Sequence, residues 1–279
     1  MRENNSRRQM LLGFMILSAI ALVAFFAGMI APHEPNQTNL GERLSPPSWQ
    51  YPFGNDNLGR CILSRIIFAA RISLYIGVVV VSLSLLIGVA LGSIAGYFGG
   101  LLDELIMRFV DAFLAFPSMF LALAVIGLMG PGLSNLILAL VVVEWTGYAR
   151  MVRGEVISLK GKEFLEAARS LGAKDSYILV RHVLPNVLAP VLVMSALGIG
   201  FTILAASGLS FLGLGVQPGI PEWGSMLDDG RLYLRVAPHL MIFPGLAITI
   251  TVLAFNLLGE GLRDELNPRF GSSIHEDAA

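Results

Sequence analysis

The sequence predicts an all-α membrane protein that crosses the bilayer six times. Of its 279 residues, 55% are apolar and only 14% are charged, and the mean hydropathy is +0.71. A soluble domain is about 45–50% apolar and about 25% charged. Charge-free runs of the roughly 20 residues that cross the hydrocarbon core recur along the whole chain.

The first four spans follow from these runs. Residues 10–30 are predicted to form a signal-anchor helix, because the run is too long for a secretory signal and lacks a small-residue cleavage site. The second span is predicted at 72–97. The uncharged run 112–143 contains Gly130-Pro131-Gly132, a turn sequence that divides it into a third and a fourth helix.

The fifth and sixth spans are predicted at 187–206 and 239–259. Residues 207–219 between them are rich in glycine, and we expect irregular backbone there that packs on protein or lines a cavity. In the second span Gly88, Gly92 and Gly96 recur every four residues. Small residues at this spacing let helix backbones approach closely, so this face is predicted to pack against another helix.

Lys and Arg residues predict the orientation of the chain. With the N-terminus in the cytoplasm, thirteen of the 19 Lys and Arg residues fall in cytoplasmic segments. Positive charge is enriched on the cytoplasmic side of membrane proteins. Both termini and the polar segment 150–186 are therefore predicted to be cytoplasmic.

Composition excludes several other classes of protein. The net charge of −1 argues against a basic nucleic-acid surface. The single cysteine, Cys61, cannot form an internal disulfide, and no Cys/His cluster predicts a metal site. The chain lacks a phosphate-binding G-x-x-x-x-G-K-[ST] loop, so we expect it not to bind nucleotide itself, and no cofactor is expected. Its histidines fall in loops or at helix ends, far from any obvious serine partner, so we expect it to catalyse no reaction itself.

One polar segment, residues 161–186, stands out from the apolar spans. Ser158 is predicted to cap a helix that runs to about Leu171, and Gly172 to end that helix in a left-handed conformation. Asp175 is predicted to cap a second short helix. A lone helix of about 12 residues is marginal in water and needs a surface to pack against.

The second short helix is predicted to stop at Pro185. In the first, Phe164, Leu165, Ala168 and Leu171 share one face. The residues alone leave two interpretations open. Both helices could lie along the bilayer surface as amphipathic connectors, or they could dock on a partner protein.

The spacing within this segment resembles a family signature. Permease subunits of ABC importers carry E-A-A-x3-G-x9-I-x-L-P, and Glu166-Ala167-Ala168, Gly172 and Leu184-Pro185 match it. His182 departs from the signature, which has an aliphatic residue there. The segment also lies before the last two spans, as it does in that family.

This resemblance implies the type I importer permease fold, in which the two short helices are coupling helices that insert into a groove on a partner ATPase. By the same resemblance Glu166 would face a cation on the ATPase. The residues implied in coupling are Phe164, Leu165, Glu166, Ala167, Ala168, Leu171, Gly172, Leu184 and Pro185.

Residues 53–77 resemble a segment of the peptide, opine and nickel branch of these permeases. The matching residues are Phe53, Gly54, Asp56, Gly59, Arg60, Ser64, Arg65, Arg71, Ser73 and Leu74. Asn55 and Cys61 replace a threonine and an aspartate, and the missing acid puts a local ion pair with Arg60 or Arg65 in doubt. Residues 58–71 are predicted to form an amphipathic helix on the outer face, whose arginines reach lipid phosphate or a protein partner.

The resemblance implies a complete assembly in the bacterial inner membrane. Its parts are a second homologous permease, two ATP-binding subunits, an extracytoplasmic solute-binding protein and membrane lipid. The chain is expected to divide into an anchor helix with a periplasmic segment (1–71), a permease core (72–262) and a cytoplasmic tail (263–279). The solute stays open among dipeptides, oligopeptides, glutathione, opines, nickel and metal chelates.

Few polar residues lie within the predicted spans. Glu144 either marks a functional site, as acids at membrane depth do, or pairs with Arg150, Arg153 or a neighbouring helix. Asp111 is predicted to pair with Arg108. The candidates for a gate or translocation path are Glu144, Ser210, Phe211, Asp228 and Asp229. The alternative function, a secondary transporter or channel without an ATPase, would need more ionisable residues in the spans.

Overall fold

The computed structural model describes residues 2–217 and 219–266, and of residues 2–5 the backbone alone. In these ranges the chain is helical and forms no strand beyond one isolated bridge. The long helices are α1 (Arg2–Phe25), α3 (Ile62–Phe98), α6 (Leu133–Lys160), α9 (Leu184–Phe211) and α11 (His239–Leu266). All five are long and apolar enough to cross a membrane, and a bent helix pair makes a sixth crossing if it is counted as one span.

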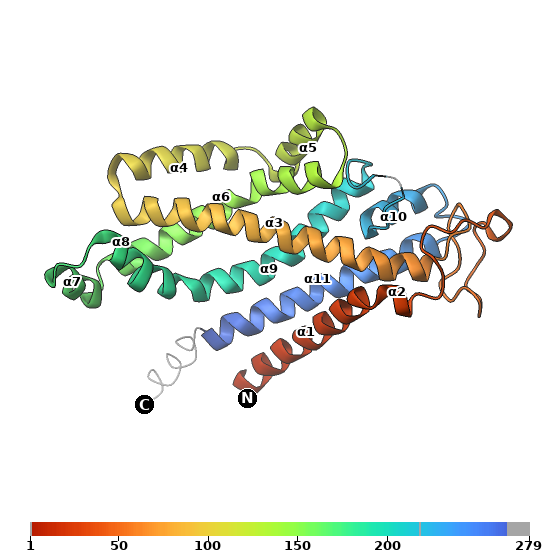
Figure 1. Cartoon of the computed structure of the whole chain (residues 1–279), viewed down its shortest axis with the longest axis horizontal. Coiled ribbons are helices and arrows are strands. Elements are labelled where there is room, and N and C mark those ends of the chain that lie inside the picture. The colour runs from red at the N-terminus through yellow and green to blue at the C-terminus, as the bar shows by residue number, and fades with distance from the viewer. Residues whose placement is uncertain (1, 218, 267–279) are drawn as a thin grey trace.

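The bent pair consists of α4 (Gly100–Leu114) and α5 (Ser118–Met129). The other short elements are α2 (Ala27–Ile30), η1 (Leu40–Glu42), α7 (Glu163–Ser170), α8 (Asp175–Ile178), η2 (Leu179–Val183) and α10 (Trp223–Arg231). In Figure 1, α7, α8, the start of α1 and the end of α11 lie toward one end of the bundle, and α10 and the 31–61 loop lie at the other. The helix α11 ends at Leu266, so most of the predicted tail, residues 267–279, lies outside the described residues.

The third crossing differs from the straight helix predicted from residue 112. The helices α4 and α5 are bent by 87° relative to each other, and the break falls before Pro117, which precedes the first turn of α5. Proline cannot donate to the carbonyl four residues earlier, and its ring clashes with that carbonyl, so Pro117 favours a break between α4 and α5.

Two other boundaries differ from the prediction. The helix α3 begins at Ile62 and contains 37 residues, so the predicted surface helix and the second span are one element. At 1.5 Å per residue it is about 55 Å long, which exceeds the hydrocarbon thickness. The helix α9 continues to Phe211, so the first part of the segment expected to be irregular, residues 207–211, is helical.

The predicted close packing of the glycine face is confirmed. A β-carbon at Gly88 would lie 2.9 Å from the backbone nitrogen of Ala149, and one at Gly96 would lie 2.9 Å from the carbonyl oxygen of Arg153. Gly92, between them, lies against the Ala149 carbonyl. Real β-carbons do not approach this closely, so α3 and α6 meet backbone to backbone along three helical turns.

Candidate functional site

The polar segment forms two short helices between α6 and α9. Ser158 does not cap the first, because α6 continues to Lys160 and the Ser158 hydroxyl donates to the carbonyl of Glu155. The helix α7 instead begins at Glu163, with acidic residues in its first turn and Arg169 in its last. This charge order complements the helix dipole.

Gly172 ends α7 as predicted. Its φ is +79°, in the left-handed region, and nothing lies within 4 Å of the place a β-carbon would take. Its N–H donates to the Arg169 carbonyl at 2.9 Å, and the Ala173 N–H donates to the Ala168 carbonyl at 3.1 Å. These are bonds of a tight helix ending, so glycine is required here by conformation and not by crowding.

The predicted docking face of α7 is divided between two environments. Leu165 is 0% exposed and belongs to a core cluster with Val156, Ile178 and Val183, against which Ala168 also packs. The prediction that Leu165 faces a partner is therefore wrong. A helix of eight residues needs tertiary packing to be stable, and Leu165 supplies it.

The opposite side of α7 is free in this chain. Leu171 is 89% exposed and Phe164 is 43% exposed, and Glu166 and Ala167 are exposed beside them. We call Phe164, Glu166, Ala167 and Leu171 the α7 surface. It combines two large apolar side chains with an acid and a small residue that lets another backbone come close.

The helix α8 is tied to α3 and not capped by Asp175. Lys174 is the N-cap residue, and the Asp175 carboxylate accepts a hydrogen bond of 2.7 Å from the Tyr97 hydroxyl. The Arg169 guanidinium lies 5.7 Å from the centroid of the Tyr97 ring. Tyr97, at the end of α3, thus holds both short helices to the bundle.

Pro185 does not stop the second short helix. Residues Leu179–Val183 form a π-helical turn, and α9 follows directly at Leu184 with Pro185 in its first turn. The wider π turn spaces the backbone around the proline, so α8 and α9 run on as one bent element. His182, in place of an aliphatic residue, lies with its ring 5.6 Å from the Tyr177 ring.

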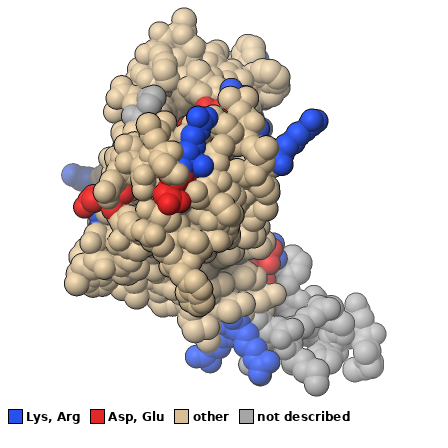
Figure 2. Space-filling view, turned by 90° about the vertical axis from the view of Figure 1, so that its right-hand side faces the viewer, with Lys and Arg blue, Asp and Glu red and all other residues tan. Residues whose placement is uncertain are grey.

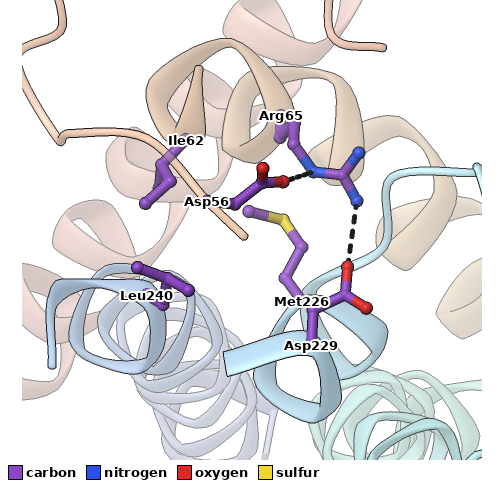
Figure 3. A pocket seen from close by; sticks show the side chains of 6 residues that line it. All are labelled: Asp56, Ile62, Arg65, Met226, Asp229 and Leu240. Atoms are coloured by element: carbon purple, nitrogen blue, oxygen red, sulfur yellow. Dashed lines mark ion pairs between the residues drawn. The ribbon is translucent and has the colours of Figure 1, made fainter. Parts of the chain in front are cut away.

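The end of the bundle that carries α10 and the 31–61 loop holds a buried charge cluster, which Figure 3 shows between α3 and α10. Arg60 is 7% exposed and Arg65 is 2% exposed. Asp56 accepts from Arg60 at 2.6 Å and lies 3.6 Å from Arg65. Asp229 lies 3.1 Å from Arg60 and 3.7 Å from Arg65. The prediction that these two arginines reach lipid phosphate is wrong.

The missing acid at position 61 is thus replaced by acids elsewhere. Cys61 is buried, and Asp56, four residues before Arg60, is the sequence signal that was overlooked. Burial raises the pKa of the Asp229 carboxyl above its ordinary value, and the two arginines oppose that shift. Charges at this end lie scattered on a mostly uncharged face (Figure 2).

Three other gate candidates, Asp228, Ser210 and Phe211, lie in or near α10 and at the end of α9. Asp228, a predicted gate residue, pairs with Arg231 at 3.0 Å. Ser210 is 2% exposed near the end of α9, and Phe211 is the last residue of that helix. Arg71 donates to the carbonyls of Ala24 and Phe25, where α1 ends.

Glu222 caps α10 from a buried position. Its carboxylate accepts from the backbone N–H groups of Gly224 and Ser225, both at 2.8 Å, and the residue is 1% exposed. Burial raises the pKa of this carboxyl, and the two N–H donors partly oppose that shift. No sequence motif had pointed to Glu222.

Glu144 lies within α6, and its carboxylate accepts from the hydroxyl of Thr202 on α9, 2.9 Å and 2.8 Å from its two oxygens. The prediction that Glu144 pairs with a neighbouring helix is confirmed. The alternatives, a pair with Arg150 or with Arg153, are wrong. Arg150 pairs with Asp111, and Arg153 pairs with Asp103 through contacts of 2.5 Å and 2.6 Å.

The predicted pair of Asp111 with Arg108 is also wrong, since Arg108 lies near Glu104. Beside Glu144 is an open pocket of about 270 Å³ between α6 and α9. Glu144, within the long helix α6, and the α7 surface, on the short helix that follows α6, are thus the two candidate sites.

Comparison with known proteins gives consistent matches. A family model described as the inner membrane component of binding-protein-dependent transport systems matches residues 88–272. A second model, the N-terminal transmembrane domain of oligopeptide transport permease C, matches residues 7–47.

Similar proteins match over nearly the whole chain. The dipeptide transport system permease protein DppC of Alkalihalophilus pseudofirmus is 44% identical over 94% of this chain and 86% of its own length. The glutathione transport system permease protein GsiD of Pectobacterium atrosepticum is 45% identical over 93% of this chain and 86% of its own. GsiD of Escherichia coli O157:H7 is 47% identical over 92% of this chain and 84% of its own.

Proposed function

The chain belongs to the inner-membrane components of binding-protein-dependent transport systems, and from this membership we propose that it carries short peptides into the cell. It is a multi-pass permease subunit of an ATP-driven importer. The observation that supports peptides is the match over more than nine-tenths of the chain to permeases named for dipeptide and glutathione transport. In the described ranges no group of three His, Cys, Asp or Glu could hold a metal ion, which disfavours bare nickel as the solute.

The α7 surface is proposed to dock on an ATP-binding subunit. Phe164 and Leu171 expose apolar area beyond the bundle, and an exposed apolar patch with a polar rim is typical of an interface. Because Leu165 fixes α7 to its own chain, the surface is already in place before a partner arrives. Glu166 would face a cation of that partner. ATP hydrolysis is assigned to the partner subunits.

The structure offers two routes by which movement of α7 and α8 could reach the bundle. The first is the π turn, which continues α8 directly into α9. The second is the hydrogen bond from Tyr97 to Asp175, which connects α8 to the end of α3. Closure of the ATP-binding subunits would therefore move α3 and α9 largely as rigid bodies.

The rest of the assembly and the orientation are part of the same proposal. Both termini and α7 are placed in the cytoplasm, because the positive charges concentrate on that side. The partners are a second homologous permease, two ATP-binding subunits and an extracytoplasmic solute-binding protein. The chain itself is assigned no cofactor, no metal and no nucleic acid.

Uptake into vesicles tests the function. The purified assembly in vesicles, with its binding protein outside, is expected to accumulate labelled alanyl-alanine or glutathione only when ATP is present at the ATP-binding subunits. Accumulation that persists without those subunits and follows an ion gradient would instead establish the alternative, a secondary transporter.

Copurification tests the docking surface. Leu171→Asp places a charge in the proposed contact, and Glu166→Lys reverses one, so each is expected to lower recovery of the ATP-binding subunit about tenfold. Leu232→Asp is the matched control, because Leu232 is similarly exposed (81%) on the outer loop. Equal recovery for all three variants would show that α7 is not the contact.

A further inference from the structure

The pocket beside Glu144 lies between α6 and α9 and is lined by an acidic side chain. Its volume is about 270 Å³, and it is open to the surface of the chain. Glu144 and Tyr148 line it from α6, and α9 supplies the other wall. The residues on that wall are Met194, Leu197, Gly198 and Phe201.

Glu144 has no cationic partner among the described residues. Its carboxylate accepts from the Thr202 hydroxyl, and the next two cations along its own helix are engaged elsewhere. Arg150 pairs with Asp111, and Arg153 pairs with Asp103. Burying an acid between apolar helices without a counter-charge costs free energy. A cation that entered the pocket would offset that cost, so its binding there would be favourable.

The Glu144 carboxylate in the pocket wall is unsuited to contact with lipid. An acid within a membrane span faces protein or a water-filled cavity and not hydrocarbon. In this chain Glu144 is only partly buried, and the pocket beside it is open. The open side must therefore face another subunit or an aqueous path through the assembly.

The chemistry of the walls selects the kind of cation. One carboxylate without further metal ligands does not bind a divalent ion well, and no group of three His, Cys, Asp or Glu lies in the described part of the chain. The ring of Phe201, which is 58% exposed, offers a face that attracts organic ammonium groups. Tyr148 also lines the pocket but is only 3% exposed. Met194 adds an adaptable apolar surface.

We propose that this pocket binds the free amino end of the transported solute, with Glu144 as the counter-charge. The proposal rests on peptide import as the function and adds what such solutes share, a primary ammonium on a variable body. The pocket is too small for a whole oligopeptide, because ligand sites usually span about 300–1,000 Å³. It would bind the amino end of the solute, and the side chains of the solute would make adaptable apolar contacts.

Thiol labelling tests the ammonium preference without any peptide. Phe201→Cys is introduced into the full assembly in vesicles, and mass spectrometry follows modification of that position by 2-aminoethyl and 2-sulfonatoethyl methanethiosulfonate. We measure the ratio of the labelling rate with the ammonium reagent to the rate with the sulfonate reagent. At residue 201 this ratio is expected to show a gain of at least about tenfold over the same ratio on free cysteine. Adding Glu144→Gln should remove that gain.

Two labelling results would overturn the site. One is an equal ratio with and without Glu144→Gln, since the carboxylate would then exert no preference. The other is an unreactive introduced thiol, because a pocket covered by a partner subunit cannot receive a solute. The native Cys61 is buried and is distinguished from residue 201 by its peptide mass.

Uptake then tests the site in transport. Alanyl-alanine and glutathione are each compared with their N-acetyl forms. Glu144→Gln is expected to lower uptake of the free amines about tenfold, to bring it near that of the acetylated forms, and to leave copurification of the partner subunits unchanged. Glu144→Asp keeps the charge and should restore most of the uptake. The matched control is Glu260→Gln, an exposed acid on α11.

The two proposals fail in different ways. If the wild type imports the probes and Glu144→Gln imports them equally well, the amino-end site is wrong and peptide import stands. If the wild type imports none of the probes, peptide import is overturned, and the labelling ratio alone decides whether the pocket prefers ammonium groups. If Glu144→Gln fails to assemble, the double variant is replaced by Phe201→Cys with Glu144→Asp, whose labelling preference must persist.

Discussion

The guanidinium of Arg60 lies 3.1 Å from the carboxylate of Asp229, although the two residues are 169 positions apart in the chain. Through this contact the segment that precedes α3 is joined to α10, which lies between the last two spans. Arg65 extends the contact to Asp56, so buried charges hold together the end of the bundle that carries α10.

The first prediction concerns this cluster. Asp229→Asn leaves two buried arginines with Asp56 as their only acid, and we expect the unfolding free energy to fall by about 1–3 kcal/mol. The loss is smaller than for a fully buried pair, because the Asp229 side chain is 41% exposed. Thermal unfolding in detergent measures it. Asp228→Asn, which removes a surface pair, is the control, and an equal shift for both variants would contradict the role of the cluster.

The second prediction concerns the pH dependence of the α10 cap. Burial raises the pKa of Glu222 above its ordinary value of 4.5. A carboxyl whose pKa is raised by folding stabilises the fold most below its unfolded pKa, and that contribution is lost as pH rises through the folded pKa. Glu222→Gln does not titrate, so the melting temperature of the wild type relative to this variant should decrease as pH rises from about 4.5.

A companion variant separates charge from capping at this position. Glu222→Ala removes the acceptor for both N–H groups and should destabilise the protein by about 1 kcal/mol more than Glu222→Gln at neutral pH. A difference between wild type and Glu222→Gln that stays constant across pH would show that the carboxyl does not titrate differently on folding.

The third prediction concerns the seam between α3 and α6. Gly92→Val would drive a branched side chain into the backbone of Ala149, and we expect a loss of about 1–3 kcal/mol or failure to fold. Gly127→Val is the control, because a β-carbon at Gly127 meets nothing within 4 Å. The amount of folded protein extracted from membranes, and its melting temperature, distinguish the two variants.

The fourth prediction concerns the turn after α7. Gly172→Val places a β-branched residue at φ +79°, where L-residues pay about 1–2 kcal/mol. We expect normal insertion into the membrane but ATP hydrolysis that is no longer coupled to uptake. Gly161→Val is the matched control, since Gly161 is equally open but has a φ of −94°.

A conservative variant sharpens this test. Asparagine tolerates the left-handed region better than other residues, so Gly172→Asn should retain most of the coupling. Normal solute uptake by Gly172→Val at normal membrane abundance would refute the proposed role of the turn.

Local patterns predicted much of the fold. Uninterrupted apolar runs located the spans, because crossing a bilayer imposes a minimum length that few other structures need. The spacing of Gly88, Gly92 and Gly96 predicted the close helix contact, and Gly172 was recognised because few other residues accept its conformation. In each case a single kind of residue meets one local structural requirement.

The errors came from contacts between distant parts of the chain. Arg60 and Arg65 looked like anchors at the membrane surface because one of their partners, Asp229, is far away in sequence and the nearby Asp56 was overlooked. Leu165 looked like part of a docking face because periodicity shows that a helix has an apolar side but not which structure covers it. The position of Ser158 satisfied the rules for a cap, yet α6 simply continued past it.

The backbone contact between α3 and α6 has a mechanical consequence. Packed helices slide past each other by rearranging the side chains between them, and at Gly88, Gly92 and Gly96 α3 has no side chain to rearrange against the α6 backbone. The two helices must therefore turn together. Since α3 is about 55 Å long and carries Tyr97 near one end and Arg65 near the other, a displacement of α8 would reach the outer charge cluster without passing through a loop.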